Sequence, residues 1–154
     1  MRVEFINPFL SSTISAFDTM LQCQLKRGDL FAKENHNPEN EVSGIIGLSG
    51  KAQGTVVLGL NREAALSATE VMLLERPTKI NGEVTDAVGE LANIIAGGAK
   101  AKLEHLQLSV SLPTVITGKH YCVDFPSKVT PICIPFDSAW GPITVEVGIS
   151  EPAQ

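Results

Sequence analysis

The chain has 154 residues, 44% of them hydrophobic and 19% charged, which is the composition of an ordinary globular domain. Its formal net charge of −5 and its scattered basic residues argue against nucleic acid as a partner, because neutralising phosphates takes clustered lysine and arginine. No apolar run approaches the roughly 18 residues that span a bilayer, so we expect no membrane partner. The length predicts one domain over residues 1–154.

The cysteines indicate a compartment. Cys23, Cys122 and Cys133 are odd in number and form no Cys-x-x-Cys pair, which fits the reducing cytoplasm. His120 and Cys122 alternate as strand neighbours do, but no third or fourth ligand lies near them in the sequence. This favours packing over a zinc site, so we expect the chain to bind no metal and no other cofactor.

The first third of the chain predicts a helix, a loop and a hairpin. Asn7-Pro8 has the residue types favoured at a helix start, and an apolar stripe follows until Gly28 is expected to end the helix. Residues 33–41 are polar and rich in turn formers, which predicts a surface loop. Two β-rich runs between Val42 and Leu60, separated by Ser49-Gly50-Lys51, predict a hairpin.

Two more helices and a set of strands follow. Asn61 is the expected N-cap of a second helix that stops before Pro77, and a third helix is expected from about Asn81 to Leu106. The remaining strand-like segments are Leu108–Thr117, Tyr121–Phe125, Thr130–Phe136 and Ile143–Ile149.

This order of elements predicts an α+β fold, an antiparallel sheet with long helices packed on one of its faces. The segment Gly54–Leu60 resembles Gly141–Ile149, and each follows a long helix by way of an earlier strand. We therefore expect two pseudo-symmetric halves, each a helix followed by a hairpin.

The third helix carries the most informative pattern. Asp86, Glu90, Asn93 and Gly97 follow one another at steps of three and four, which places them in one stripe opposite an apolar side. A carboxylate and a carboxamide that project together can hold a partner's cation and a water molecule, which suits hydrolysis of a phosphoryl group on another protein. On pattern alone, an ordinary solvated face is the more common explanation of such a stripe.

Glycines interrupt the same helix, where each costs about 1 kcal/mol relative to alanine. Gly89 and Gly98 are expected to permit close packing of the helix. Gly97, one turn beyond Asn93, is expected to let a partner surface approach.

The segment Glu83–Lys102, with Asp86-x-x-x-Glu90-x-x-Asn93, resembles the signature of the CheC/CheX family of chemotaxis phosphatases. Phe5–Phe9 is similar to that family's entry to its first helix, and Leu112–Gly118 to its strand after the signature helix. CheC-type members carry the signature twice. The first helix here offers Asp18-x-x-x-Gln22-x-x-Leu25, which lacks the acid and the amide, so the resemblance is to the CheX-like branch.

The resemblance implies an enzyme that hydrolyses the aspartyl phosphate of a CheY-type response-regulator receiver, which holds its own Mg²⁺. By this resemblance Asn93 holds the attacking water and Glu90 pairs with the receiver's active-site lysine. Asp86 and Gly97 would support docking, and CheX-type members act as homodimers. The run Val110–Ile116 is a candidate for a sheet continued across subunits, or else for an edge protected within the monomer.

Two alternatives come from other functional classes. The same fold serves flagellar switch proteins, so the chain is alternatively a noncatalytic docking module. A weaker hypothesis is a scaffold that recognises an unphosphorylated receiver. The intact Glu90 and Asn93 pair favours the enzyme.

Overall fold

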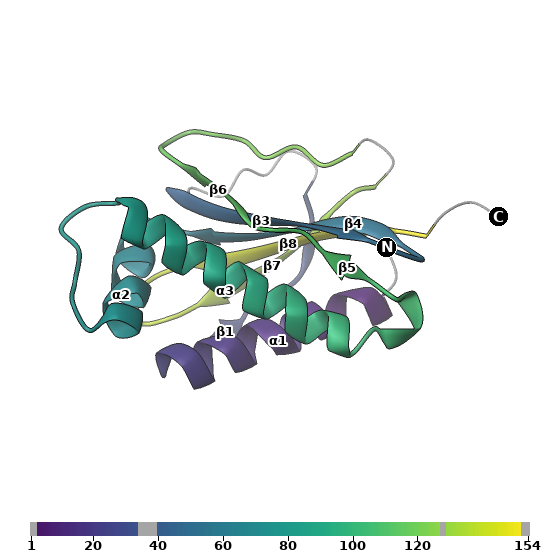
Figure 1. Ribbon diagram of the computed structural model, residues 1–154, viewed down its shortest axis with the longest axis horizontal. Coiled ribbons are helices and arrows are strands. Elements are labelled where there is room, and N and C mark those ends of the chain that lie inside the picture. The colour runs from purple at the N-terminus through teal and green to yellow at the C-terminus, as the bar shows by residue number, and fades with distance from the viewer. Residues whose placement is uncertain (1–2, 34–39, 127–128, 152–154) are drawn as a thin grey trace.

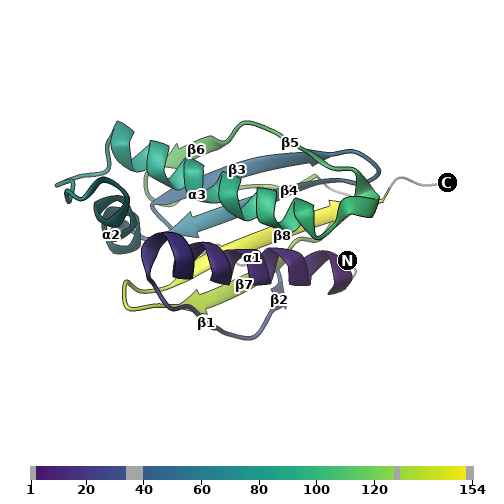
Figure 2. The same ribbon diagram turned by 60° about the horizontal axis from the view of Figure 1, so that its bottom comes forward.

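The computed structural model describes residues 3–33, 40–126 and 129–151. Their helices lie together on one face of an antiparallel sheet, as Figures 1 and 2 show, which confirms the predicted α+β fold. The helices are α1 (Val3–Leu21), α2 (Arg62–Leu73), α3 (Gly82–Ala101) and a short 3₁₀ turn (Glu104–Leu106). The strands are β1 (Lys26–Arg27), β2 (Phe31–Ala32), β3 (Val42–Ser49), β4 (Gln53–Leu60), β5 (Ser109–Val110), β6 (Thr114–Thr117), β7 (Ile132–Asp137) and β8 (Ile143–Ser150).

Asparagine side chains begin the second and third helices, as the sequence predicts. Asn61 Oδ1 accepts a hydrogen bond of 2.7 Å from the amide of Ala64, and Asn81 Oδ1 accepts one of 3.2 Å from Val84. Each bond satisfies an amide that has no partner inside its own helix. The third helix was expected to continue to Leu106, but α3 ends at Ala101 and the chain reaches Leu106 through the 3₁₀ turn.

Helix α1 differs from its prediction at both ends. It is already helical at Val3 and contains Pro8, although proline forgoes one backbone hydrogen bond there. Burial of the Phe5 and Ile6 side chains holds this early part of the helix on the core. The helix ends at Leu21, followed by Gln22 in the left-handed region at φ 53°, so Gly28 is not its end. Most of the predicted loop at 33–41 lies outside the described residues.

The strand order β1-β7-β8-β4-β3-β5, with β2 also on β7 and β6 also on β3, confirms the two related halves. Strands β4 and β8 pair along their full lengths at the centre. The short strands after α1 pair with β7 of the second half, and those after α3 pair with β3 of the first. β5 begins 83 residues after β1, and the same number separates β6 from β2.

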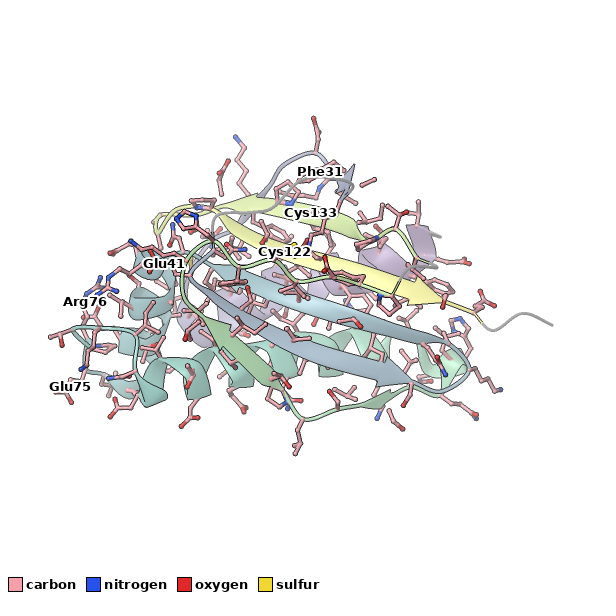
Figure 3. The ribbon with its side chains drawn as sticks, turned by 90° about the horizontal axis from the view of Figure 1, so that it is seen from above. Phe31, Glu41, Glu75, Arg76, Cys122 and Cys133 are labelled. Atoms are coloured by element: carbon pink, nitrogen blue, oxygen red, sulfur yellow. The ribbon has the colours of Figure 1, made fainter. Side chains whose placement is uncertain are left out.

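Two predicted strands are wrong in detail. The run Leu108–Thr117 is divided, with Pro113 between β5 and β6. The run 121–125 forms no strand; it lies across the face of the sheet that carries no helix, where Figure 3 shows Cys122. Side chains hold this segment: the Tyr121 and Ser43 hydroxyls lie 2.6 Å apart, and Lys33 Nζ donates to the Val123 carbonyl at 2.7 Å.

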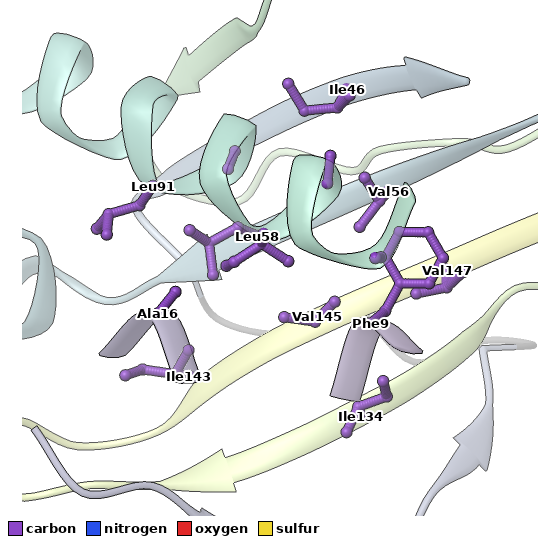
Figure 4. Packing of buried hydrophobic residues seen from close by; sticks show 14 of the residues in the cluster. Phe9, Ala16, Ile46, Val56, Leu58, Leu91, Ile134, Ile143, Val145 and Val147 are labelled. Carbon is purple, nitrogen blue, oxygen red and sulfur yellow. The ribbon is translucent and has the colours of Figure 1, made fainter. Parts of the chain in front are cut away.

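The core lies between the helices and the sheet. Figure 4 shows Phe9 of α1 and Leu91 of α3 next to strand residues such as Leu58 and Val145, all of them buried. A Cβ on Gly44 of β3 would lie 2.9 Å from the Ala92 Cβ, so the glycine lets α3 approach the sheet. Among the described residues, no helix has the length and apolar character needed to cross a membrane.

The opposite face holds a buried ion pair. Lys33 Nζ lies 2.8 Å from Glu146 Oε2, with 8% and 4% of the two side chains exposed. Cys133 lies on the same face and is fully buried. Burial, and to a smaller degree the nearby Glu146 carboxylate, raises the pKa of the Cys133 thiol to about 12.

Candidate active site on helix α3

Helix α3 turns its polar stripe to solvent. Asp86, Glu90, Asn93 and Gly97 are all exposed. The other side of the helix is buried against the sheet and α1 through Val84, Val88, Leu91 and Ile95. The structure therefore brings the four predicted residues together on one accessible ridge, with Glu90 and Asn93 about one turn apart.

Close packing fixes the ridge on the side of α1. A Cβ on Gly98 would lie 2.3 Å from Ser12 Oγ, so the glycine permits the two helices to meet. Ser12 Oγ donates a hydrogen bond of 2.8 Å to the Ile95 carbonyl, and Lys102 Nζ donates one of 2.6 Å to Ser11 Oγ. By contrast, a Cβ on Gly97 would have no neighbour within 4 Å. The expected packing role of Gly98 is thus confirmed, and the space above Gly97 is open.

A shallow hollow separates the ridge from strand β6. A Cβ on Gly89 would lie 3.3 Å from Pro113 Cγ and 3.4 Å from Val115 Cγ2, so this glycine lets β6 lie beside α3. The hollow has a volume of about 340 Å³. It is lined by Thr85, Asp86, Gly89, Glu90, Pro113, Val115 and Thr117. The sequence predicted that Gly89 serves packing but gave no signal that Pro113 and Val115 would flank Glu90.

The ridge presents two functional groups with different chemistry. The Glu90 carboxylate accepts hydrogen bonds from a cation, while the Asn93 amide donates and accepts at once. In the described part of the chain, no three His, Cys, Asp or Glu side chains gather as a metal site. Glu83 and Asp86 are exposed with Glu90 on the first half of the helix and make it acidic, whereas Lys100 lies near its end.

Helix α1 has an exposed acid and amide three residues apart, Glu4 and Asn7, but not at the places that Glu90 and Asn93 hold on α3. Gln22 and Leu25 lie beyond its end, so the stretch Asp18-x-x-x-Gln22-x-x-Leu25 is not the structural counterpart of the α3 pattern. The shift of 83 residues that relates the short strands pairs Asn7 with Glu90 and Leu10 with Asn93. Ser12 and Ile95 are equivalent under this shift and contact each other, as expected where two related helices cross.

The sequence pattern of the family described as chemotaxis phosphatase CheX matches residues 42–137, which include the whole of α3. The chain belongs to this CheX family. A CheC-like superfamily protein from Shewanella sp. PV-4 has 35% sequence identity, a TM-score of 0.90, and coverage of 97% of this chain and 99% of its own. The CheY-P phosphatase CheX of Thermotoga maritima is 25% identical over 123 residues, which cover 77% of this chain and 79% of that protein.

More distant structures share the CheX fold. In the CheX–CheY–BeF3–Mg²⁺ complex from Borrelia burgdorferi, the matching chain has 24% identity and a TM-score of 0.81, covering 97% of this chain and 100% of its own. The middle domain of FliM from Helicobacter pylori has 6% identity and a TM-score of 0.68, covering 94% of this chain and 86% of its own. These likenesses concern the fold alone.

Proposed function

We propose that this CheX-family protein is a phosphatase that hydrolyses the aspartyl phosphate of a CheY-type receiver domain. The observation that carries the proposal is the exposed Glu90 and Asn93 pair on a helix whose other side is packed. Family membership supports it, as does the activity named for the relative from Thermotoga maritima. A receiver substrate also supports the expected cytoplasmic location.

In the proposed mechanism, the receiver supplies the acyl phosphate and its bound Mg²⁺, and this chain supplies the helix. Asn93 would hold a water in line with the phosphorus by donating to it and accepting from it. Fixing the water removes part of its entropic barrier. The water oxygen bonds to phosphorus as the bond from phosphorus to the aspartyl oxygen breaks, which releases inorganic phosphate and restores the receiver carboxylate.

Glu90 would seat the helix by pairing with the receiver's active-site lysine. Its position beside the hollow leaves room for an incoming cation. Asp86, one turn earlier, would support docking, and the open space at Gly97 would let the receiver surface approach α3 closely. Positioning and electrostatics of this kind are the main contributions that proteins make to phosphoryl transfer.

The test is the decay of radiolabelled phosphate on CheY-type receivers, with and without this protein. Asn93→Ala is expected to remove the stimulated decay while receiver binding remains nearly intact, and Glu90→Ala to weaken both. Glu83→Ala is the matched control, since it is an exposed carboxylate on the same helix, two turns before Glu90. If Asn93→Ala hydrolyses the phosphorylated receiver as fast as the parent, the catalytic assignment is wrong.

The fold likeness to the FliM middle domain favours one other function, a noncatalytic docking module. Such a module would bind a receiver, yet the lifetime of the phosphate would be the same with and without it. The decay measurement therefore separates the two functions.

A homodimer is part of the proposal. Strand β6 pairs with β3 on one side, and no other described strand pairs with it, so its second edge could continue the sheet in another copy. The alternative is a protected monomer edge, because β6 has only four residues, between Pro113 and Gly118. Sedimentation equilibrium of the parent decides between them.

A further inference from the structure

The ridge on α3 lacks the kind of side chain that usually supplies binding energy between proteins. Its exposed residues between Gly82 and Ala101 are small, charged or amide. Protein interfaces are stabilised mainly by a few buried aromatic, arginine or aliphatic anchors surrounded by contacts of little net energy. A partner seated on this ridge therefore needs an apolar anchor from a neighbouring element.

Leu112 is such a residue, with 89% of its surface exposed. It lies in the link between β5 and β6, directly before Pro113, which lines the same hollow as Glu90 and Asp86. A stable interface covers about 800 Å² on each partner, far more than one helical stripe. A protein that reaches Glu90 across this hollow also meets Pro113, the residue that directly follows Leu112 in the β5–β6 link.

The link is held in place before any partner arrives. The Ser111 amide donates to the Gly47 carbonyl at 2.9 Å, and the Gly47 amide donates to Ser111 Oγ at 2.8 Å. Ser111 Oγ also donates to the Leu112 carbonyl at 2.9 Å. An anchor on a backbone fixed in this way loses little conformational entropy when it is buried.

We propose that Leu112 is an apolar anchor for the receiver domain, an inference that rests on the proposed phosphatase function. The receiver would bury Leu112 while its phosphorylated pocket engages Glu90 and Asn93. A second copy of this chain is the competing occupant. Pro113 has no amide hydrogen, so a strand added along β6 loses its pairing at that residue, before it reaches Leu112.

The experiment measures stimulated phosphate decay on a CheY-type receiver phosphorylated with acetyl phosphate, over a range of concentrations of this protein. Leu112→Ala is expected to raise the half-saturating concentration about tenfold and to leave the maximal rate unchanged, because the side chain contributes to docking and not to chemistry. Leu112→Met, which keeps an apolar side chain of similar size, is expected to restore most of the affinity.

Leu74 provides the matched control. It is a leucine with 91% of its surface exposed, at the C-cap of α2, and Figures 1 and 2 show the α2–α3 connection at one end of the molecule, far from β5, which directly precedes the link that holds Leu112. Leu74→Ala is expected to match the parent in half-saturating concentration and in maximal rate. Both alanine variants replace exposed side chains and should fold normally.

The outcomes are separable. If the parent accelerates decay and Leu112→Ala behaves identically, the anchor is wrong and the phosphatase stands. If Leu112→Ala changes the sedimentation of the free protein, the occupant is a second copy and the proposal for the receiver is overturned. If the parent accelerates no receiver's decay, the proposed function fails and the anchor fails with it.

Discussion

Helices α1 and α3 occupy equivalent places in the two halves, yet at the places of Glu90 and Asn93 helix α1 has Asn7 and Leu10. Asn93 is exposed, whereas its counterpart Leu10 is half-buried and packs against the core. The burial of the two helices otherwise follows the same sequence of buried and exposed positions over most of their length. The repeat therefore fixes the scaffold, and the residue at this position decides whether its side chain packs on the core or faces solvent.

The largest effect is expected from exchanging Asn93 of α3 and Leu10 of α1, the residues that occupy the same place on the two helices. Asn93→Leu places the α1 residue on α3 and is expected to reduce stimulated phosphate decay to the spontaneous rate, with stability within about 0.5 kcal/mol of the parent. Leu10→Asn is expected to retain the activity and to lower the free energy of unfolding by about 1–2 kcal/mol, because part of its apolar contact is lost. Phosphate decay and urea unfolding measure the two effects.

If Asn93→Leu and Leu10→Asn changed the stimulated phosphate decay equally, the expected functional difference between α3 and α1 would be contradicted. That result would mean that both helices take part in the reaction, or that neither does.

The second test uses adjacent glycines of α3. Gly98→Ala is expected to lower the free energy of unfolding by about 1–3 kcal/mol, because the new methyl group would displace the hydrogen-bonded Ser12 side chain. Gly97→Ala meets nothing within 4 Å and is expected to stabilise the protein by up to about 1 kcal/mol. Urea unfolding of the two variants measures this difference.

Receiver binding tests the second expected role, that of Gly97 at the partner surface. Gly97→Ala should weaken receiver binding if the receiver approaches α3 at that position. Unchanged binding by this stabilised variant would contradict the partner role of Gly97.

The third test concerns the hairpins of the two halves. The hairpin from Val42 to Leu60 has Lys51 as its only charged residue, whereas the hairpin from Ile132 to Ser150 buries Cys133 and Glu146. The pKa of Cys133 is about 12 in the folded protein against an ordinary value of 9.0. The unfolded thiol ionises first as the pH rises, so the free energy of unfolding should fall by about 1 kcal/mol between pH 9 and pH 10.

Urea unfolding at pH 8, 9 and 10 under reducing conditions measures this slope. Cys133→Ala should flatten it, since the alanine cannot ionise in either state. A slope that is identical in parent and variant would assign the pH dependence to other groups.

The smallest expected effect concerns the first position of the α3 stripe. Asp86→Asn should weaken receiver binding about threefold at low ionic strength and have no measurable effect at about 0.5 M salt, because exposed charges at an interface rim are screened. Val3 is the counterpart of Asp86 on α1, so Val3→Ala should have no effect at either salt concentration. The measurement is a titration of the phosphorylated receiver at both salt concentrations. If the difference in affinity between the parent and Asp86→Asn were the same at both, this role of Asp86 would be contradicted.

The sequence predicted those elements whose signals are local. Asn61 and Asn81 cap their helices by bonds to residues three positions later, and the hairpin between Val42 and Leu60 pairs residues close in the chain. The exposure of Glu90 and Asn93 followed from helical periodicity alone. Their catalytic roles stay predictions, since they depend on a partner.

The missed features depend on residues far apart in sequence. Strands β1 and β2 have two residues each and exist because β7, about a hundred residues later, pairs with them. The segment at 121–125 has strand-forming residues, but Ser43 and Lys33 hold it by side-chain bonds instead. The flanking of Glu90 by Pro113 likewise arises only when β6 lies beside α3.

The exchange of short strands between the halves has a consequence for synthesis on the ribosome. When residue 73 has emerged, β1 and β2 still lack β7, and β4 lacks β8, so the nascent chain presents unpaired strand edges. Those edges can close only after the segment through Ser150 has left the exit tunnel. A chain cut between α2 and α3 should therefore yield two pieces that gain structure only when they are mixed.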